Sequence, residues 1–414
     1  LGNYRGHLSR RSDRISLLDP YGRRADEVEY FDEGRWPGYA DGGGSSLELR
    51  DPRADNSRAE AWAASDESPR ASWRSYSYRA VCAQAGVGPT LWSEFVLGLL
   101  DAGEVLLDDL SVVESPDGVR KQLLQDGGFE GGGAAWRMLG NHGRSGIIAD
   151  PLDPSNHVLR LVATGPTEHM HNHIETTLAG GARAVDGRTY EVSFRAHWIA
   201  GSNLLNTRLY FNRLARTTVL EAPVTGGTPG ARNSRAEEDI GPTFSVLRHE
   251  PVAPGPDEAV TVSSVASDPD GLAGADLLWS VKGGAWASAP MAVGVDGSLR
   301  GTIPGQAAGA LVQFYIQAID GHGLAATLPA GGPSSRALYR VRDGQAVLGK
   351  VHNLRILMTP ADTAFLHLET NVMSNERLGS TLVYDERLAV YDCGVRLKGS
   401  ERGRPENGRV GFNL

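Results

Sequence analysis

The chain has 414 residues, of which 40% are hydrophobic and 22% charged, as is typical of globular proteins. Its length predicts two to four domains, and its 52 glycines and 22 prolines favour loop-rich β structure. The net charge of −9 argues against a general nucleic-acid binder, and no run of about 18 apolar residues is present to predict a transmembrane segment.

Residues 1–68 predict short strands at 14–18 and 25–31, joined by a turn at 19–22 that contains Pro20 and Gly22. A Trp-Pro pair at 36–37, a glycine-rich run at 40–49 and the closing Trp62 follow. This order resembles the second half of a lamin-tail domain, which implies an immunoglobulin-like binding sandwich. Asp41, Asp51 and Asp55 are candidate calcium ligands, although loop aspartates usually cap turns.

Residues 69–235 carry strand patterns at 72–79, 91–97, 103–113, 157–163, 189–198 and 207–211. The run at 103–113 and an opening strand expected at 126–130 resemble galactose-binding and carbohydrate-binding jelly rolls. Residues 69–114 and 117–235 form either one composite jelly roll or two neighbours. The resemblance implies a glycan or a surface protein as partner.

Several side chains in this stretch have two readings. Trp136, Trp198 and Tyr210 are candidates for stacking on sugar rings, or they are core aromatics. Asp108 and Asp109 are adjacent on a strand and point to opposite faces, so we expect turn or calcium ligands rather than a catalytic pair.

His169, His171 and His173 alternate along the chain between Glu168 and Glu175. On a strand, the three imidazoles would share one face, which predicts a three-histidine metal site. The alternative is an exposed polar strand without a ligand.

A linker rich in glycine, proline and charge follows at 225–242, and residues 243–345 predict an immunoglobulin-like or fibronectin-like sandwich. Strands are expected at 259–263, 277–281, 311–318 and 337–341. The acidic turn at 268–271 either binds calcium or is turn chemistry that needs no ligand, and Asp320-Gly321 predicts a hairpin turn. Cys82 and Cys393 fall in different predicted domains, so no disulfide is expected between them.

Residues 350–414 predict a strand at 351–358, and then a helix with Thr359 as its N-cap and Pro360 at its first position. We expect Ala361, Ala364, Phe365, Leu368 and Val372 to form its apolar stripe. A hairpin of residues 380–384 and 391–398 follows. Its second strand alternates so that Arg396 and Lys398 share the solvent face, ahead of Arg402 and Arg404 on a Gly/Ser turn. This pattern fits either a phosphate cradle or an ordinary charged hairpin.

The run GVRLKGS at 394–400 resembles the signature of the spore-coat-protein-H (CotH) kinase-like family, and the preceding strand, helix and hairpin follow the order of that domain's opening. The resemblance covers about 65 residues. It implies nucleotide or phosphate contacts for Arg396, Lys398, Arg402 and Arg404, with ATP and Mg²⁺ or Mn²⁺ as cofactors of the full-length domain. The family often has a lysine where this sequence has Arg409. Its catalytic carboxylates lie further downstream, so we expect no catalysis by this chain alone.

The expected fold class is mainly β, with tandem sandwiches followed by the start of an α+β kinase-like domain. The first functional hypothesis is a fragment of an extracellular or cell-envelope protein whose modules bind or space partners ahead of an atypical kinase. The alternative is a non-enzymatic adhesin that binds glycans or proteins. The resemblances imply the location, and the sequence itself shows no signal peptide; because Leu1 is not an initiator Met, we expect both ends to be cut.

Overall fold

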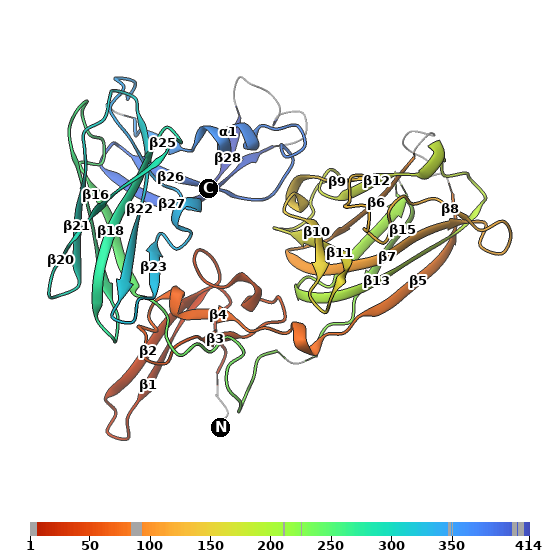
Figure 1. Cartoon of the computed structure of the whole chain (residues 1–414), viewed down its shortest axis with the longest axis horizontal. Coiled ribbons are helices and arrows are strands. Elements are labelled where there is room, and N and C mark those ends of the chain that lie inside the picture. The colour runs from red at the N-terminus through yellow and green to blue at the C-terminus, as the bar shows by residue number, and fades with distance from the viewer. Residues whose placement is uncertain are drawn as a thin grey trace.

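The computed structural model describes residues 6–83, 93–209, 212–224, 226–346, 349, 351–399, 404 and 410–414. Its sheets are all antiparallel, and the chain is mainly β, as predicted. Four parts follow one another: a first module (residues 12–64), a large sandwich (74–219), a second sandwich (243–340) and a terminal segment (354–413). Figure 1 shows the terminal segment, in blue, beside the second sandwich and extending toward the large one.

The first module consists of two separate two-stranded sheets, β1(Ser12–Leu18) with β2(Arg24–Phe31) and β3(Leu47–Leu49) with β4(Trp62–Ala64). The turn predicted at 19–22 joins the first pair, and the Asp19 carboxylate accepts hydrogen bonds from the backbone of Tyr21 and Arg23. In the residues described, these pairs do not close into a sandwich.

The large sandwich has two sheets. Its strands are β5(Arg74–Val81), β6(Glu94–Leu99), β7(Gly103–Glu114), β8(Lys121–Gln122), β9(Trp136–Met138), β10(Gly146–Asp150), β11(Asp153–Ala163), β12(Ile174–Thr177), β13(Thr189–Gly201), β14(Leu204–Leu209) and β15(Arg213–Val219). One sheet has the order β10-β11-β7-β13-β5 with β8 on β7, and the other has the order β15-β14-β6-β12-β9. Strands from 69–114 therefore pair with strands from 117–235 in both sheets, and one apolar core lies between them. The two stretches form a single sandwich.

Two details of the large sandwich differ from the prediction. Residues 126–130 are a turn rather than an opening strand, because the Asp126 carboxylate accepts hydrogen bonds from the backbone of Gly131 and Gly133. Trp136 and Trp198 are 5% and 2% exposed, so they are core aromatics and offer no stacking platform. Tyr210 lies outside the described residues.

The second sandwich also has two sheets. Its strands are β16(Thr243–Glu250), β17(Val260–Ser267), β18(Leu272–Val281), β19(Trp286–Pro290), β20(Ala292–Val293), β21(Ser298–Ile303), β22(Leu311–Asp320), β23(Ala325–Leu328) and β24(Ala337–Arg340). The orders are β16-β17-β21-β20 and β19-β18-β22-β23, with β24 also on β22. Alternating apolar residues of the two sheets meet in its core, among them Val260, Leu277, Phe314 and Ile316.

The terminal segment has one sheet, β25(Leu354–Leu357), β26(Leu378–Tyr384), β27(Leu388–Lys398) and β28(Gly411–Asn413), with the helix α1(Pro360–Leu366). Thr359 is the N-cap and its hydroxyl accepts a hydrogen bond from the Asp362 backbone, as predicted. The predicted apolar stripe is wrong: α1 ends at Leu366, and Leu366 is its buried side chain while Phe365 and Leu368 are 40% and 49% exposed.

Short 3₁₀ turns lie at Gly38–Ala40, Ala59–Ala61, Ser68–Arg70, Gly140–His142, Ala179–Gly181 and Gly332–Ser334. In the part of the chain that the structure describes, no helix has the length and apolar character needed to cross a bilayer. Both cysteines are free thiols.

Candidate functional site

Strand β27 presents its basic residues as its alternation predicts. Val395 and Leu397 are fully buried, and Arg396 and Lys398 lie on the opposite face. The Arg396 guanidinium donates from Nη1 to the side-chain oxygen of Asn375 at 2.6 Å, whereas Lys398 is exposed. The strand thus fixes the position of one cation and leaves the next one free in solvent.

Arg396 opens onto a cleft that two parts of the chain build together. The cleft has a volume of about 480 Å³. Its lining consists of Arg144, Thr164, Gly165 and Pro166 from the large sandwich and Asn375, Glu376, Arg377 and Arg396 from the terminal segment. We call it the arginine cleft.

The charge of the arginine cleft comes from three guanidinium groups and one carboxylate. Glu376, which is 7% exposed, forms an ion pair with Arg144 across the cleft. Arg377 lies 3.8 Å from Glu33 of the first module, a long and exposed pair. Because guanidinium groups bind phosphate and carboxylate in a planar, two-pronged geometry, this balance favours an anionic ligand.

Backbone and amide hydrogen bonds hold the two walls of the cleft together. The Gly140 amide donates to the Thr370 carbonyl at 2.9 Å, and the Asn172 side chain donates to the Met373 carbonyl at 3.1 Å. Asn375 donates to the Pro166 carbonyl and to Glu168, both at 3.0 Å. Gly140 has a φ of +58°, and a Cβ there would lie 1.9 Å from the Asn172 oxygen, so only glycine fits this contact.

Arg404 contacts backbone carbonyls within the terminal segment. Its side chain is buried, and its guanidinium donates to the carbonyls of Gly399, Val372 and Ser374 at 2.9, 3.4 and 3.2 Å. Burial, with the nearby Arg396 cation, lowers its pKa below the ordinary arginine value. Arg404 therefore braces residues 372–374 behind the cleft, and its phosphate contact remains a prediction. Arg402 and Arg409 lie outside the described residues.

The three histidines lie in a turn, not on a strand, so the predicted common face is wrong. His169 and His171 have ring centroids 4.7 Å apart, whereas His173 is buried, with Nδ1 on the Met170 carbonyl and Nε2 3.0 Å from Glu175. β11 ends at Ala163, and the Gly165-Pro166 pair that follows disfavours a strand before the histidines begin. Metal binding by this turn remains a prediction.

The aspartates expected as turn or calcium ligands divide into two sets. Asp41, Asp51 and Asp55 form no group of three converging metal-ligating side chains in the described part of the chain. Asp108 is buried and accepts a hydrogen bond from Asn156, whereas Asp109 is exposed, and the two carboxylates lie 3.6 and 3.4 Å from the same Nη1 of Arg195. Asp268 and Asp270 of the acidic turn do converge with other potential metal-ligating side chains, Asp268 with Asp239 and Asp320, and Asp270 with Asp239 and His322.

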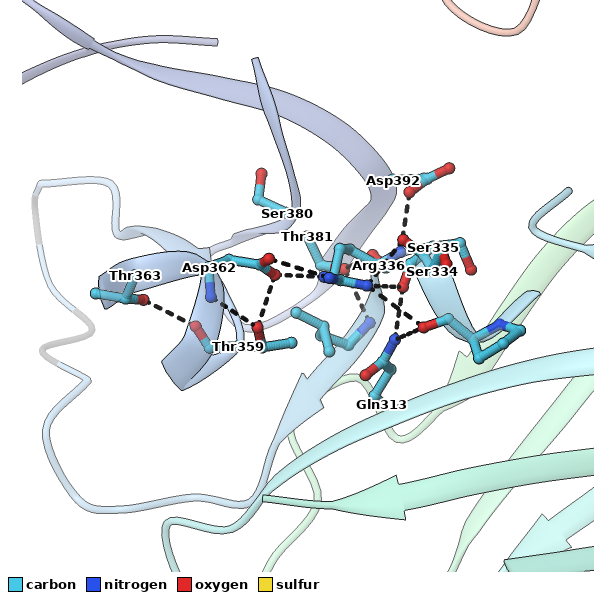
Figure 2. Close-up of polar contacts among 12 residues, drawn as sticks. Gln313, Ser334, Ser335, Arg336, Thr359, Asp362, Thr363, Ser380, Thr381 and Asp392 are labelled. Carbon is cyan, nitrogen blue, oxygen red and sulfur yellow. Dashed lines mark hydrogen bonds and ion pairs between the residues drawn. The ribbon is translucent and has the colours of Figure 1, made fainter. Parts of the chain in front are cut away.

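The terminal segment meets the second sandwich on its other side through an ion pair that the sequence did not indicate (Figure 2). The Arg336 guanidinium lies against both oxygens of Asp362 and donates to the carbonyls of Ser334 and Ser335 at 2.8 and 2.9 Å. Burial tends to raise the pKa of Asp362, but hydrogen bonds from Arg336 and Thr359 hold it below its ordinary value. Both side chains are 18% exposed, so the pair is partly shielded from water.

No protein-family model and no curated protein matches the chain. Among solved structures it is similar to the pullulanase of Anoxybacillus sp. LM18-11 in complex with maltotriose, at 10% identity and a TM-score of 0.18, over 62% of this chain and 29% of that one. A DUF4785 family protein from Legionella pneumophila matches at 7% identity and a TM-score of 0.18, over 76% and 68%. The pullulanase of Bacillus acidopullulyticus matches at 11% and 0.15, over 64% and 34%. The chain thus spans less than a third of the first pullulanase, and likenesses this weak support no statement about its function.

Proposed function

We propose that the chain is the β-sandwich arm of an extracellular or surface protein, and that its terminal segment is the start of a CotH-like atypical kinase domain. In this proposal the large sandwich supplies part of the phosphate-binding surface of that domain. The observation that carries it is the arginine cleft, where Arg396 of the signature strand shares one cavity with Arg144 of the large sandwich.

The residues of the cleft suit the phosphates of a nucleotide. Three guanidinium groups converge on one cavity, and Arg396 is held in place by Asn375. A phosphate gains charge-assisted hydrogen bonds there that a neutral ligand does not. The chain's part would be to bind and orient phosphate, because phosphoryl transfer depends largely on positioning and charge neutralisation.

The same residues do not supply a metal site. The single carboxylate among the residues that line the arginine cleft is Glu376, and it is already paired with Arg144. Mg²⁺ or Mn²⁺ would therefore be bound by carboxylates elsewhere in a complete kinase-like domain. No metal-dependent step is assigned to the residues described here.

The test is to titrate the purified chain with ATP and with inorganic pyrophosphate by calorimetry, and to repeat it with Arg396→Ala and Arg144→Ala. A hydrogen bond to a charged group is worth about 1.5–3 kcal/mol, so each variant should weaken binding by about tenfold to a hundredfold. Arg300→Ala is the matched control, because Arg300 is exposed on β21 and lines no part of the cleft.

Equal binding by Arg396→Ala and Arg300→Ala would contradict the proposal. If the folded wild-type chain binds neither ATP nor pyrophosphate, the adhesin alternative is left, and immobilised glycans become the ligands to test. Binding that Arg144→Ala weakens as much as Arg396→Ala would support a site shared between the two parts of the chain.

A further inference from the structure

Three aspartates from separate segments converge at one end of the second sandwich. Asp239 lies on the linker before β16, Asp268 lies in the turn between β17 and β18, and Asp320 is the last residue of β22. One carboxylate oxygen of each lies within 4.8 Å of the others. Local sequence patterns give no reason for three like charges to meet there.

Asp320 is the least expected member of this group because it is completely buried. Its Oδ1 accepts hydrogen bonds from the backbone of His322 and Leu324 at 2.8 and 2.9 Å. Its Oδ2 has no hydrogen-bond partner in the protein. Because this oxygen is also buried, bulk water does not supply the missing hydrogen bond. A buried, unsatisfied carboxylate oxygen is costly, and it indicates that a positively charged partner completes the site.

The nearby cations pair with Asp239 and with the neighbouring Asp270. Arg53 of the first module lies 3.1 Å from Asp270 Oδ2 and 3.4 Å from Asp239 Oδ1, and His322 Nδ1 lies 2.8 Å from Asp239 Oδ2. No ion pair joins a described cationic side chain to Asp320. Burial and the charges of Asp320, Asp239 and Asp270 raise the pKa of Asp268, as expected for carboxylates that repel one another.

The backbone holds these carboxylates on rigid elements. Leu272 pairs with Asp320 across β18 and β22, and the Gly321 amide donates to the Gly271 carbonyl at 3.1 Å. A Cβ on Gly321 would lie 2.5 Å from the Asp270 carbonyl oxygen, and one on Gly241 would lie 2.9 Å from the Ala325 carbonyl carbon. The two turns and the linker are therefore in close backbone contact, and the site does not depend on a flexible loop.

We propose that Asp239, Asp268 and Asp320 bind one Ca²⁺ ion, which fastens the linker to the second sandwich. An all-carboxylate group offers hard oxygen ligands, and Ca²⁺ accepts six to eight oxygens in irregular geometry, so backbone carbonyls and water complete its shell. Mg²⁺ requires near-ideal octahedral geometry, and Zn²⁺ would favour the neighbouring group that contains His322. This proposal does not depend on the function proposed for the arginine cleft.

The test uses the whole chain after treatment with a chelator, followed by calorimetric titration with CaCl₂, MgCl₂ and ZnCl₂ separately. We expect saturable Ca²⁺ binding at one site, weakened at least tenfold by Asp320→Asn and by Asp239→Asn. Asp296→Asn is the matched control, because Asp296 belongs to an exposed Asp-Gly turn of the same sandwich and its carboxylate is satisfied by Ser298. Asp239→Asn lies outside the sheets, so it remains informative if Asp320→Asn does not fold.

A second test measures the melting temperature of Asp320→Asn relative to the wild type, and we expect the difference to change sign when Ca²⁺ is added. Without metal, Asp320→Asn should have a higher melting temperature than the wild type, because it removes a buried charge from among like charges. With Ca²⁺ present, the wild type should be the more stable, since a ligand bound only by the folded state raises stability. Ca²⁺ binding that Asp320→Asn leaves unchanged, or no binding below millimolar Ca²⁺, would each overturn the proposal.

Discussion

The terminal segment contacts two sandwiches, and the two contacts are built differently. Toward the second sandwich, Leu338 packs with Leu357 and Val383 of the terminal sheet in one apolar cluster. Toward the large sandwich, the contact consists of hydrogen bonds to carbonyls such as those of Thr370 and Met373 and of the Arg144–Glu376 ion pair, around the open arginine cleft. The first contact resembles a domain core, and the second resembles a polar interface between separable proteins.

This difference indicates that the contact with the second sandwich stabilises the fold, whereas the contact with the large sandwich leaves room for a ligand. Water replaces a carbonyl hydrogen bond at small net cost, but it does not replace apolar contacts or a shielded ion pair. We therefore expect the second sandwich and the terminal sheet to unfold together. The contact with the large sandwich should open more easily.

The largest expected effect comes from Arg336→Met. This change leaves Asp362 charged and shielded, and it removes the donors to Ser334 and Ser335. Removing one partner of a buried pair costs about 3–5 kcal/mol. Because this pair is 18% exposed and Asp362 keeps its hydrogen bond from the Thr359 hydroxyl, we expect a loss at the lower end of that range, which urea unfolding should show for the second sandwich and the terminal segment together. Arg300→Met is the exposed control. A loss below about 1 kcal/mol would mean that the two contacts are equally weak.

The second effect is a dependence on pH at the same junction. His249 donates from Nε2 to the Val252 carbonyl at 3.0 Å, and its Nδ1 lies 2.6 Å from the Tyr391 hydroxyl. Burial lowers the pKa of His249 to about 4 from an ordinary value of 6.5. Below pH 6.5 the unfolded chain binds a proton that the folded chain does not, so stability is full above pH 6.5 and falls toward pH 4.

The loss from His249 should reach about 3 kcal/mol at pH 4. Hydrogen exchange of β24 and β26 across this range measures it, because those strands report on the junction. His249→Gln should remove most of the slope. If stability depends on pH equally in the wild type and in His249→Gln, then His249 is not the cause of the pH dependence at this junction.

A smaller loss of stability is expected at the contact between the terminal segment and the large sandwich. Asn375→Ala removes the bonds to the Pro166 carbonyl and to Glu168, which are exposed, and should cost about 1 kcal/mol locally. Hydrogen exchange at residues 370–376 should quicken while exchange in β24 stays unchanged. Faster exchange in both places would show that the two contacts are coupled.

The smallest effect is that of salt. Arg144 is 65% exposed in its pair with Glu376, so raising the salt concentration from about 0.1 M to about 1 M should weaken that pair by a few tenths of a kcal/mol. The Arg336–Asp362 pair is more deeply buried, so the salt concentration should weaken it less. Equal salt dependence of exchange at residues 370–376 and at β26 would contradict the comparison.

Local patterns predicted most of what is local in this fold. The alternation of residues 395–398 correctly indicated the buried and exposed faces of β27, and Thr359 was identified as a helix cap from four residues. The same reasoning failed for the histidines at 169, 171 and 173, because the prediction of a strand did not take into account the Gly165-Pro166 pair before them. Periodicity alone does not distinguish a strand from a turn of alternating residues.

Contacts between distant segments were not predictable in the same way. The ion pair between Asp362 and Arg336 depends on how the terminal sheet packs on β24. Asp320 was expected only in a hairpin turn, and its meeting with Asp239 depends on the path of the linker. Of the predicted cations, only Arg396 lines the arginine cleft among the described residues, and Arg144, which lines the same cleft, carries no local signal.

The apolar cluster shared by Leu338, Leu357 and Val383 also bears on how such a protein evolves. Domain shuffling by recombination succeeds when the breakpoint falls between independent cores. The sequence predicts a domain boundary near residue 345. A breakpoint there separates Leu338 from Leu357 and Val383, so it exposes both halves of one apolar cluster. The second sandwich and the terminal sheet should therefore be inherited as a single unit, and homologues that exchange one without the other should carry compensating polar residues at these three positions.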